Sequence, residues 1–311
     1  MIGRSAELEA LESALETAAN GAASAVEVVG PAGIGKSRLL GELGERADAR
    51  GAIVLNGAGA EFEQDLPYWL FVDALDEYVA GVDPRRLDRL DPTIRAELGQ
   101  VLPALADATT EHAPALHERY RTHRAMRELL EQLAATRPLV LILDDVHWAD
   151  PASIDLLVAL VHRPPAAGVL VTVAARPRQL PARLATALDR ACRAGALARL
   201  ELEPLTREQA RELVGGDADE LYEETGGNPF FLEQLARSAT RGAGGETHLA
   251  GIGVPSMVAA ALTEELALLS DPARRVLDAA AVAGDPFEVD LAAAVAGVTE
   301  RQVLDALDEL A

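Results

Sequence analysis

The fold of this chain is decided by one short stretch of sequence, Gly30-Pro31-Ala32-Gly33-Ile34-Gly35-Lys36-Ser37. Before this stretch, residues 25–29 form a β-branched segment that predicts a strand. Residues 36–46, which begin inside the stretch, have the apolar spacing of a helix. A strand, the pattern GxxxxGK[ST] and a helix in this order predict a phosphate-binding loop, because the glycines let backbone N–H groups wrap an anion. We expect Lys36 to reach the phosphates and Ser37 to ligate Mg²⁺.

Lys36 is also the only lysine in a chain with 28 lysines and arginines. The two residue types are not interchangeable at a phosphate, because lysine is a compact point charge and arginine a planar fork. The position of this lysine therefore strengthens the prediction of a phosphate loop.

Four more segments read as strands, residues 52–55, 139–143, 168–175 and 198–202. Residues 139–143 form a continuous apolar run, which is typical of a strand buried on both faces of a parallel sheet. Helical patterns lie between the strands, and the first covers residues 8–18, with Ser5 placed to cap it. The sequence thus predicts an α/β fold, a P-loop NTPase core with a doubly wound, mostly parallel, five-stranded sheet.

The chain is helical in pattern after the last predicted strand. We expect a core over residues 1–205 with a helical insertion at about 62–136, a helical lid over 206–240, and a glycine-rich linker over 241–254. Residues 255–311 are expected to form a helical segment and the start of a winged-helix domain.

Composition limits the partners of this chain. Its 311 residues carry 50 acidic side chains against 28 basic ones, a net charge of −22, which disfavours binding to DNA or to a membrane surface. No apolar run approaches the ~18 residues of a membrane span, and no signal peptide is recognisable. A single cysteine, Cys192, fits a reducing compartment, so we expect a cytoplasmic location.

An acidic pair, Asp144-Asp145, follows the apolar strand at residues 139–143. Ligands of parallel sheets bind at the carboxyl ends of the strands, so we assign Asp144 to the Mg²⁺ shell, through water, and Asp145 to orienting or deprotonating an attacking water. Asp150, before Pro151, is placed as a helix N-cap. His147 and Trp148 are interpreted as packing or loop residues.

Five motifs in order give the chain a family resemblance: Gly3-Arg4 with Glu7-Leu8, the phosphate loop, Asp144-Asp145-Val146-His147-Trp148-Ala149-Asp150, Ala175-Arg176-Pro177 and Thr225-Gly226-Gly227-Asn228-Pro229-Phe230. Together they resemble the AAA-like ATPase region of the STAND class, and most of all the large ATP-binding LuxR-type (MalT-like) regulators. The resemblance covers nearly the whole chain. It implies that Arg176 senses the γ-phosphate, that Asn228 and Pro229 in the lid pack on adenine, and that Gly3 and Arg4 complete the adenine pocket. Arg38, directly after the phosphate loop, is expected to join the nucleotide contacts.

The resemblance implies a signalling ATPase that binds Mg-ATP, hydrolyses it slowly to ADP and differs between the two states in self-association. DNA would be bound only through a C-terminal domain outside this chain. Three alternatives stay open: a non-hydrolysing module locked on ADP, a small-molecule kinase whose acceptor site is the insertion, and, as a weaker rival, an origin-recognition type of ATPase.

Overall fold

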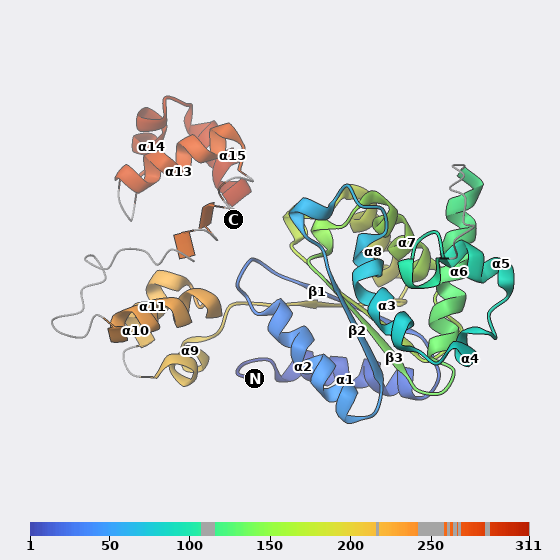
Figure 1. Ribbon diagram of the computed structural model, residues 1–311. Coiled ribbons are helices and arrows are strands. Elements are labelled where there is room, and N and C mark those ends of the chain that lie inside the picture. The colour runs from blue at the N-terminus through green and yellow to red at the C-terminus, as the bar shows by residue number, and fades with distance from the viewer. Residues whose placement is uncertain are drawn as a thin grey trace. The chain divides into compact units, whose positions relative to one another are not determined.

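The computed structural model describes residues 1–106, 116–215, 218–241, 258–259, 262–263, 266, 269–283 and 287–310. The chain divides into two compact units, Met1–Phe230 and Phe231–Ala311. Five strands lie in the first unit: β1 (Ser24–Val29), β2 (Ile53–Ala58), β3 (Leu139–Asp144), β4 (Val169–Ala175) and β5 (Ala198–Glu201). They form one sheet in the order β2-β3-β4-β1-β5, and every neighbouring pair is parallel (Figure 1). The predicted fold class is confirmed.

Helices cover both faces of this sheet, as Figure 1 shows. The helices of the first unit are α1 (Ser5–Ala19), α2 (Lys36–Ala49), α3 (Trp69–Gly81), α4 (Pro84–Leu87), α5 (Pro92–Leu98), α6 (Leu116–Leu133), α7 (Pro151–His162), α8 (Ala182–Arg193), α9 (Arg207–Val214) and α10 (Ala218–Thr225), while α11 (Pro229–Arg241) begins in it. One buried cluster joins the sheet to α1 and α2, and another joins the opposite face to α3, α6, α7 and α8. Because both faces are covered, all seven residues of β4 are buried, including its one polar residue, Thr172.

The start of α1 differs from the prediction. Ser5 is the first residue of the helix, Arg4 occupies the N-cap position, and no side chain caps the end. The serine therefore does not act as the cap that its residue type suggested. The side chain of Arg4 is held elsewhere, by two backbone carbonyls described below, and this fixes where the helix begins.

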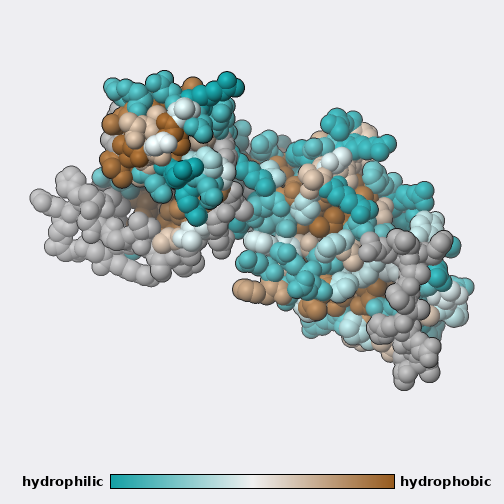
Figure 2. Space-filling view, turned by 90° about the horizontal axis from the view of Figure 1, so that it is seen from above, coloured by the Kyte–Doolittle hydropathy of each residue, from teal (hydrophilic) through white to brown (hydrophobic). Residues whose placement is uncertain are grey.

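Among its described residues, the second unit includes the helices α13 (Asp271–Ala283), α14 (Val289–Ala296) and α15 (Glu300–Leu310). They pack through small side chains, among them Ala273, Val276, Ala292 and Val303. Most of the predicted linker lies outside the described residues. Val282, Leu291, Val295 and Leu304 are exposed on this unit, and Figure 2 shows hydrophobic residues at its surface.

In the part of the chain that the structure describes, none of the helices has the length and apolar character that crossing a membrane demands.

Candidate functional site

The strand registers bring three loops to one edge of the sheet. Val29 at the end of β1 pairs with Ala175 at the end of β4, and Leu143, one residue before the end of β3, pairs with Val173. The phosphate loop after β1, the acidic pair at the end of β3 and Arg176 after β4 therefore leave the sheet side by side. This is the carboxyl edge at which parallel sheets bind ligands.

The phosphate loop joins β1 directly to α2. Gly33 and Gly35 have φ angles of 73° and 105°, which L side chains rarely adopt. Lys36 is the first residue of α2 and is buried, and its Nζ donates to the carbonyl oxygens of Gly30 and Pro31, both at 2.9 Å. The lysine side chain thus curls back over the loop, while Ser37 and Arg38 are exposed in the first turn of the helix.

The acidic pair has an unusual backbone. Asp145 has a φ of 47°, in the left-handed region that non-glycine residues rarely occupy, and its N–H donates to Oδ1 of Asp144 at 2.8 Å. Positive φ in a non-glycine residue costs roughly 1 to 3 kcal/mol and clusters at functional sites. The bend turns the chain sharply from β3 into the turn Val146–Trp148.

His147 lies inside this bend, and its side chain is fully buried. Its Nδ1 is 3.8 Å from Oδ1 of Asp145, and both ring nitrogens lack a hydrogen-bond partner among the described residues. Burial is the main cause that lowers the pKa of His147, and together with the positive charges of Arg176 and Lys36 it brings the pKa to about 4. The imidazole is therefore neutral at neutral pH, and the electric fields of Arg176 and Lys36 both reach it.

Sequence reasoning missed this environment of His147, which it treated as a packing or loop residue. The signal that pointed to it was its position two residues after the acidic pair, but spacing alone does not reveal that an imidazole is buried beside two cations. Trp148 is a packing neighbour, with its ring 5.3 Å from that of His147.

Asp150 caps α7 as predicted, and its carboxylate also accepts a hydrogen bond from the segment that precedes α3. Its Oδ1 accepts from the backbone N–H groups of Ala152, Ser153 and Tyr68, each at 2.9 Å. Tyr68 precedes α3, so this one carboxylate ties the start of the insertion to the helix that follows the acidic strand. The cap is 2% exposed, which places these bonds in the interior.

The N-terminal residues reach the back of the phosphate loop. The guanidinium of Arg4, which is 4% exposed, donates to the carbonyls of Ile34 at 3.1 Å and Glu203 at 2.8 Å. Gly3 has a φ of 65°, and a Cβ at this position would lie 2.6 Å from the side chain of Gln209 in α9. Arg4 thus links the loop to the segment after β5, and Gly3 packs against the lid.

The segment Gly227-Asn228-Pro229 also contacts the phosphate loop. Nδ2 of Asn228 donates to the carbonyl of Ala32 at 2.9 Å, and the N–H of Phe230 donates to Oδ1 of Asn228 at 3.0 Å. Pro229 is the first residue of α11, where its fixed φ suits a helix start. The loop is therefore held from two sides, by residues 3–4 and by residues 228–230, which are remote from it in sequence.

Comparison with known proteins agrees with this geometry. The family model described as AAA ATPase domain matches residues 1–173. An uncharacterized protein of Rhizobium meliloti (strain 1021) is 28% identical over 94% of this chain, and the chain spans 30% of the length of that relative.

Solved structures resemble the chain more distantly. A RuvB variant of Thermotoga maritima is 16% identical, with a TM-score of 0.45, over 99% of this chain and 88% of that one. Cdc6p of Pyrobaculum aerophilum is 15% identical, with a TM-score of 0.45, over 99% and 85%. A STAND protein of Pyrococcus horikoshii with a tetratricopeptide repeat sensor is 17% identical, with a TM-score of 0.42, over 95% and 38%. The assignment therefore rests on the sequence match, which covers more than half of the chain and includes the phosphate loop and the acidic pair: the chain belongs to the AAA ATPase domain family.

Proposed function

We propose that this chain is a nucleotide-controlled switch of the STAND type, which binds Mg-ATP, hydrolyses it slowly and signals through the difference between its ATP and ADP states. The observation that carries the proposal is the meeting of the phosphate loop, the acidic pair and Arg176 at one edge of the sheet. The match to the AAA ATPase domain family supports it.

The residues of the loop suit a nucleotide triphosphate. Backbone N–H groups of residues 30–37 and the start of α2 would cradle the phosphates, and Lys36 would exchange its bonds to Gly30 and Pro31 for bonds to the β and γ phosphates. Gly3, Arg4, Asn228 and Pro229 would shape the adenine side, because they already pack around the loop from behind.

Mg²⁺ fits the donor set at this edge. It prefers oxygen ligands and keeps several waters, and Ser37 offers an exposed hydroxyl while Asp144 offers a half-buried carboxylate. Mg²⁺ would neutralise phosphate charge when bound. Asp145 would orient or deprotonate the attacking water. His147 is neutral, and its Nδ1 lies 3.8 Å from Oδ1 of Asp145, so the imidazole would border that carboxylate without a hydrogen bond to it.

Arg176 would read the γ-phosphate. It leaves the sheet beside the acidic pair, and its charge acts on His147 together with that of Lys36. An arginine that contacts only the triphosphate gives ATP and ADP different affinities, which is what a two-state switch needs.

The resemblance to LuxR-type regulators supports a transcriptional output, delivered through a DNA-binding domain outside this chain. The net charge of −22 supports placing DNA contact elsewhere. We also propose that the nucleotide state controls self-association.

The test is nucleotide binding by the Lys36→Ala variant, measured by calorimetry, with phosphate release measured in parallel. We expect the variant to fold and to lose ATP binding, since a charge-assisted contact to phosphate contributes roughly 1.5 to 3 kcal/mol. Wild-type affinity in the variant would remove the phosphate-loop assignment. Single-turnover hydrolysis separates a slow ATPase from an ADP-locked module, and phosphate release without an acceptor argues against a kinase.

A further inference from the structure

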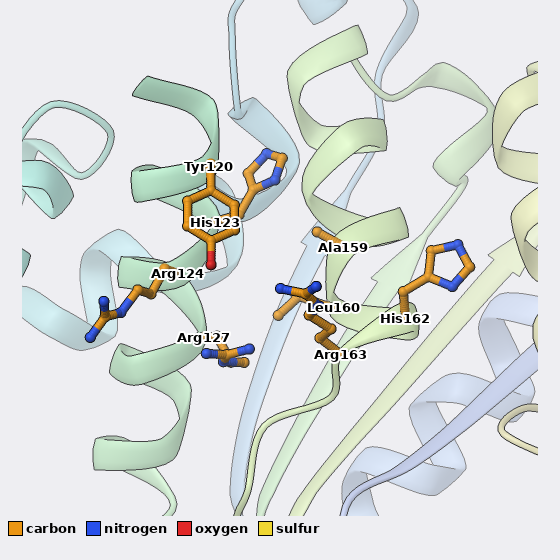
Figure 3. Close-up of a pocket in the computed structure, with 8 residues that line it drawn as sticks. All are labelled: Tyr120, His123, Arg124, Arg127, Ala159, Leu160, His162 and Arg163. Atoms are coloured by element: carbon orange, nitrogen blue, oxygen red, sulfur yellow. The ribbon is translucent and has the colours of Figure 1, made fainter. Parts of the chain in front are cut away.

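A second cavity lies away from the phosphate loop, between α6 and α7. Its volume is about 250 Å³, and the polar side chains that line it are Tyr120, His123, Arg124, Arg127, His162 and Arg163 (Figure 3). Leu160 and Ala159 of α7 complete the lining. Nothing in the proposed nucleotide chemistry uses these residues.

The charge of this lining is opposite to that of the chain. Acidic residues outnumber lysine and arginine by 50 to 28 overall, yet none is among the eight described residues that line the cavity, and five of these eight are arginine or histidine. A lining drawn at random from this composition would carry about one basic side chain. The cavity is therefore a local basic site on an acidic protein, which concentrates small anions near it.

The two helices contribute their arginines from opposite sides. Figure 3 shows the side chains of Arg127 from α6 and Arg163 from the end of α7 extending toward the space between the helices, whereas His162 points away from it. The hydroxyl of Tyr120 points toward the same region. Two guanidinium groups and a phenol from facing helices therefore border the cavity, and the carboxylate of Glu131 lies 3.7 Å from the guanidinium of Arg127.

The existing ion pairs leave these arginines available. Arg163 forms no ion pair with any residue that the structure describes, and Arg127 lies 3.7 Å from Glu131 along its own helix. This pair is half-buried and its 3.7 Å separation exceeds hydrogen-bond distance, so a ligand carrying two negative charges can compete with it. A basic residue at the end of α7 also complements the helix dipole, but this role does not account for Arg127 on the facing helix.

We propose that the cavity between α6 and α7 is a binding site for a small dianion, a phosphate monoester or a dicarboxylate, held by Arg127 and Arg163. The volume limits the ligand to a few carbon atoms, because sites for drug-sized molecules begin at roughly 300 Å³. The site stands at the last turn of α7, the helix whose first turn is fastened by Asp150 at the acidic edge. A ligand here therefore contacts the same rigid element that borders the nucleotide site, at its other end.

The test is calorimetric titration of the full chain at low ionic strength with inorganic phosphate and, separately, with succinate. Phosphate also fits the phosphate loop, so the titrations are made in the Lys36→Ala background. We expect saturable binding of at least one probe, weakened about ten-fold or more by Arg163→Ala and by Arg127→Ala. Arg193→Ala is the matched control, because it removes an exposed arginine at the end of α8 and changes the net charge equally.

The two probes separate the sources of the ligand chemistry. Binding of phosphate alone assigns the site to phosphate monoesters, and binding of succinate assigns it to dicarboxylates. Binding of neither probe overturns the proposal, as does equal binding in Arg163→Ala and Arg193→Ala. The outcome is independent of the nucleotide assignment, since no measurement here uses ATP or its hydrolysis.

Discussion

Acid stability offers a direct measure of the environment of His147. The unfolded chain protonates this histidine near its ordinary pKa of 6.5, whereas in the folded chain burial and the charges of Arg176 and Lys36 hold the pKa to about 4. Between these two values the unfolded state binds more protons than the folded state, so stability falls as the pH is lowered through this window. Each pKa unit corresponds to about 1.4 kcal/mol, so His147 costs the fold about 3 kcal/mol by pH 4 and nothing above pH 7.

Replacing His147 by glutamine removes this proton-binding difference. We expect the free energy of unfolding of His147→Gln, relative to wild type, to increase by about 3 kcal/mol as the pH falls from 7.5 to 4. Urea unfolding followed at several pH values measures this difference, and His162→Gln, at the exposed end of α7, corrects for the loss of a histidine as such. If the curves of wild type and His147→Gln run parallel over the whole range, His147 is not the buried neutral group described here.

Four further substitutions test the site. Arg176→Ala should weaken ATP binding by about 10-fold to 150-fold, which corresponds to the loss of one charge-assisted contact, while ADP affinity stays almost unchanged. Calorimetry with both nucleotides measures these affinities. A parallel loss of affinity for ATP and ADP would reduce Arg176 to a structural residue. Asp145→Asn should keep Mg-ATP but slow hydrolysis, while Asp144→Asn should weaken the Mg²⁺ dependence, and equal effects on metal affinity would contradict our division of roles. Arg4→Ala should lower the free energy of unfolding by about 2 to 5 kcal/mol, because the buried bond to the carbonyl of Ile34 and the partly buried bond to that of Glu203 lose their charged donor. Unfolding in urea measures this change, and a value under 1 kcal/mol would contradict the prediction.

The strands of this fold could be predicted from short segments rich in apolar residues, although β1 includes Glu27 and β5 includes Arg199. Residues 139–143 predicted a strand covered on both faces, and β3 is an interior strand of the sheet, between β2 and β4. The order of all five strands depends on which helix covers which face, and this long-range packing has no local signature.

At the site, too, local features could be predicted from the sequence and long-range contacts could not. The phosphate loop and Asp150 are local devices, in which a few adjacent residues fix the backbone, and the sequence predicted the cap of α7 correctly. The bonds from Asn228 to Ala32 and from Arg4 to Ile34 join residues remote in sequence, so the fold must exist before they can form. The capping role predicted for Ser5 was wrong, because Ser5 is the first residue of α1 and Arg4 occupies the N-cap position.

The two edge strands of the sheet, β2 and β5, limit how copies of this protein can associate. An edge strand with free N–H and C=O groups is a template for pairing with another chain, and proteins protect such edges with short strands, charges or covering helices. β5 has only four residues, and its Arg199 turns inward to pair with Glu27 of β1 at 2.6 Å and with Asp189 of α8 at 2.7 Å. At the opposite edge, α3 packs along β2. Sheet-to-sheet pairing is thus discouraged at both edges, so contact between copies should not seed the growth of a continuous β-sheet.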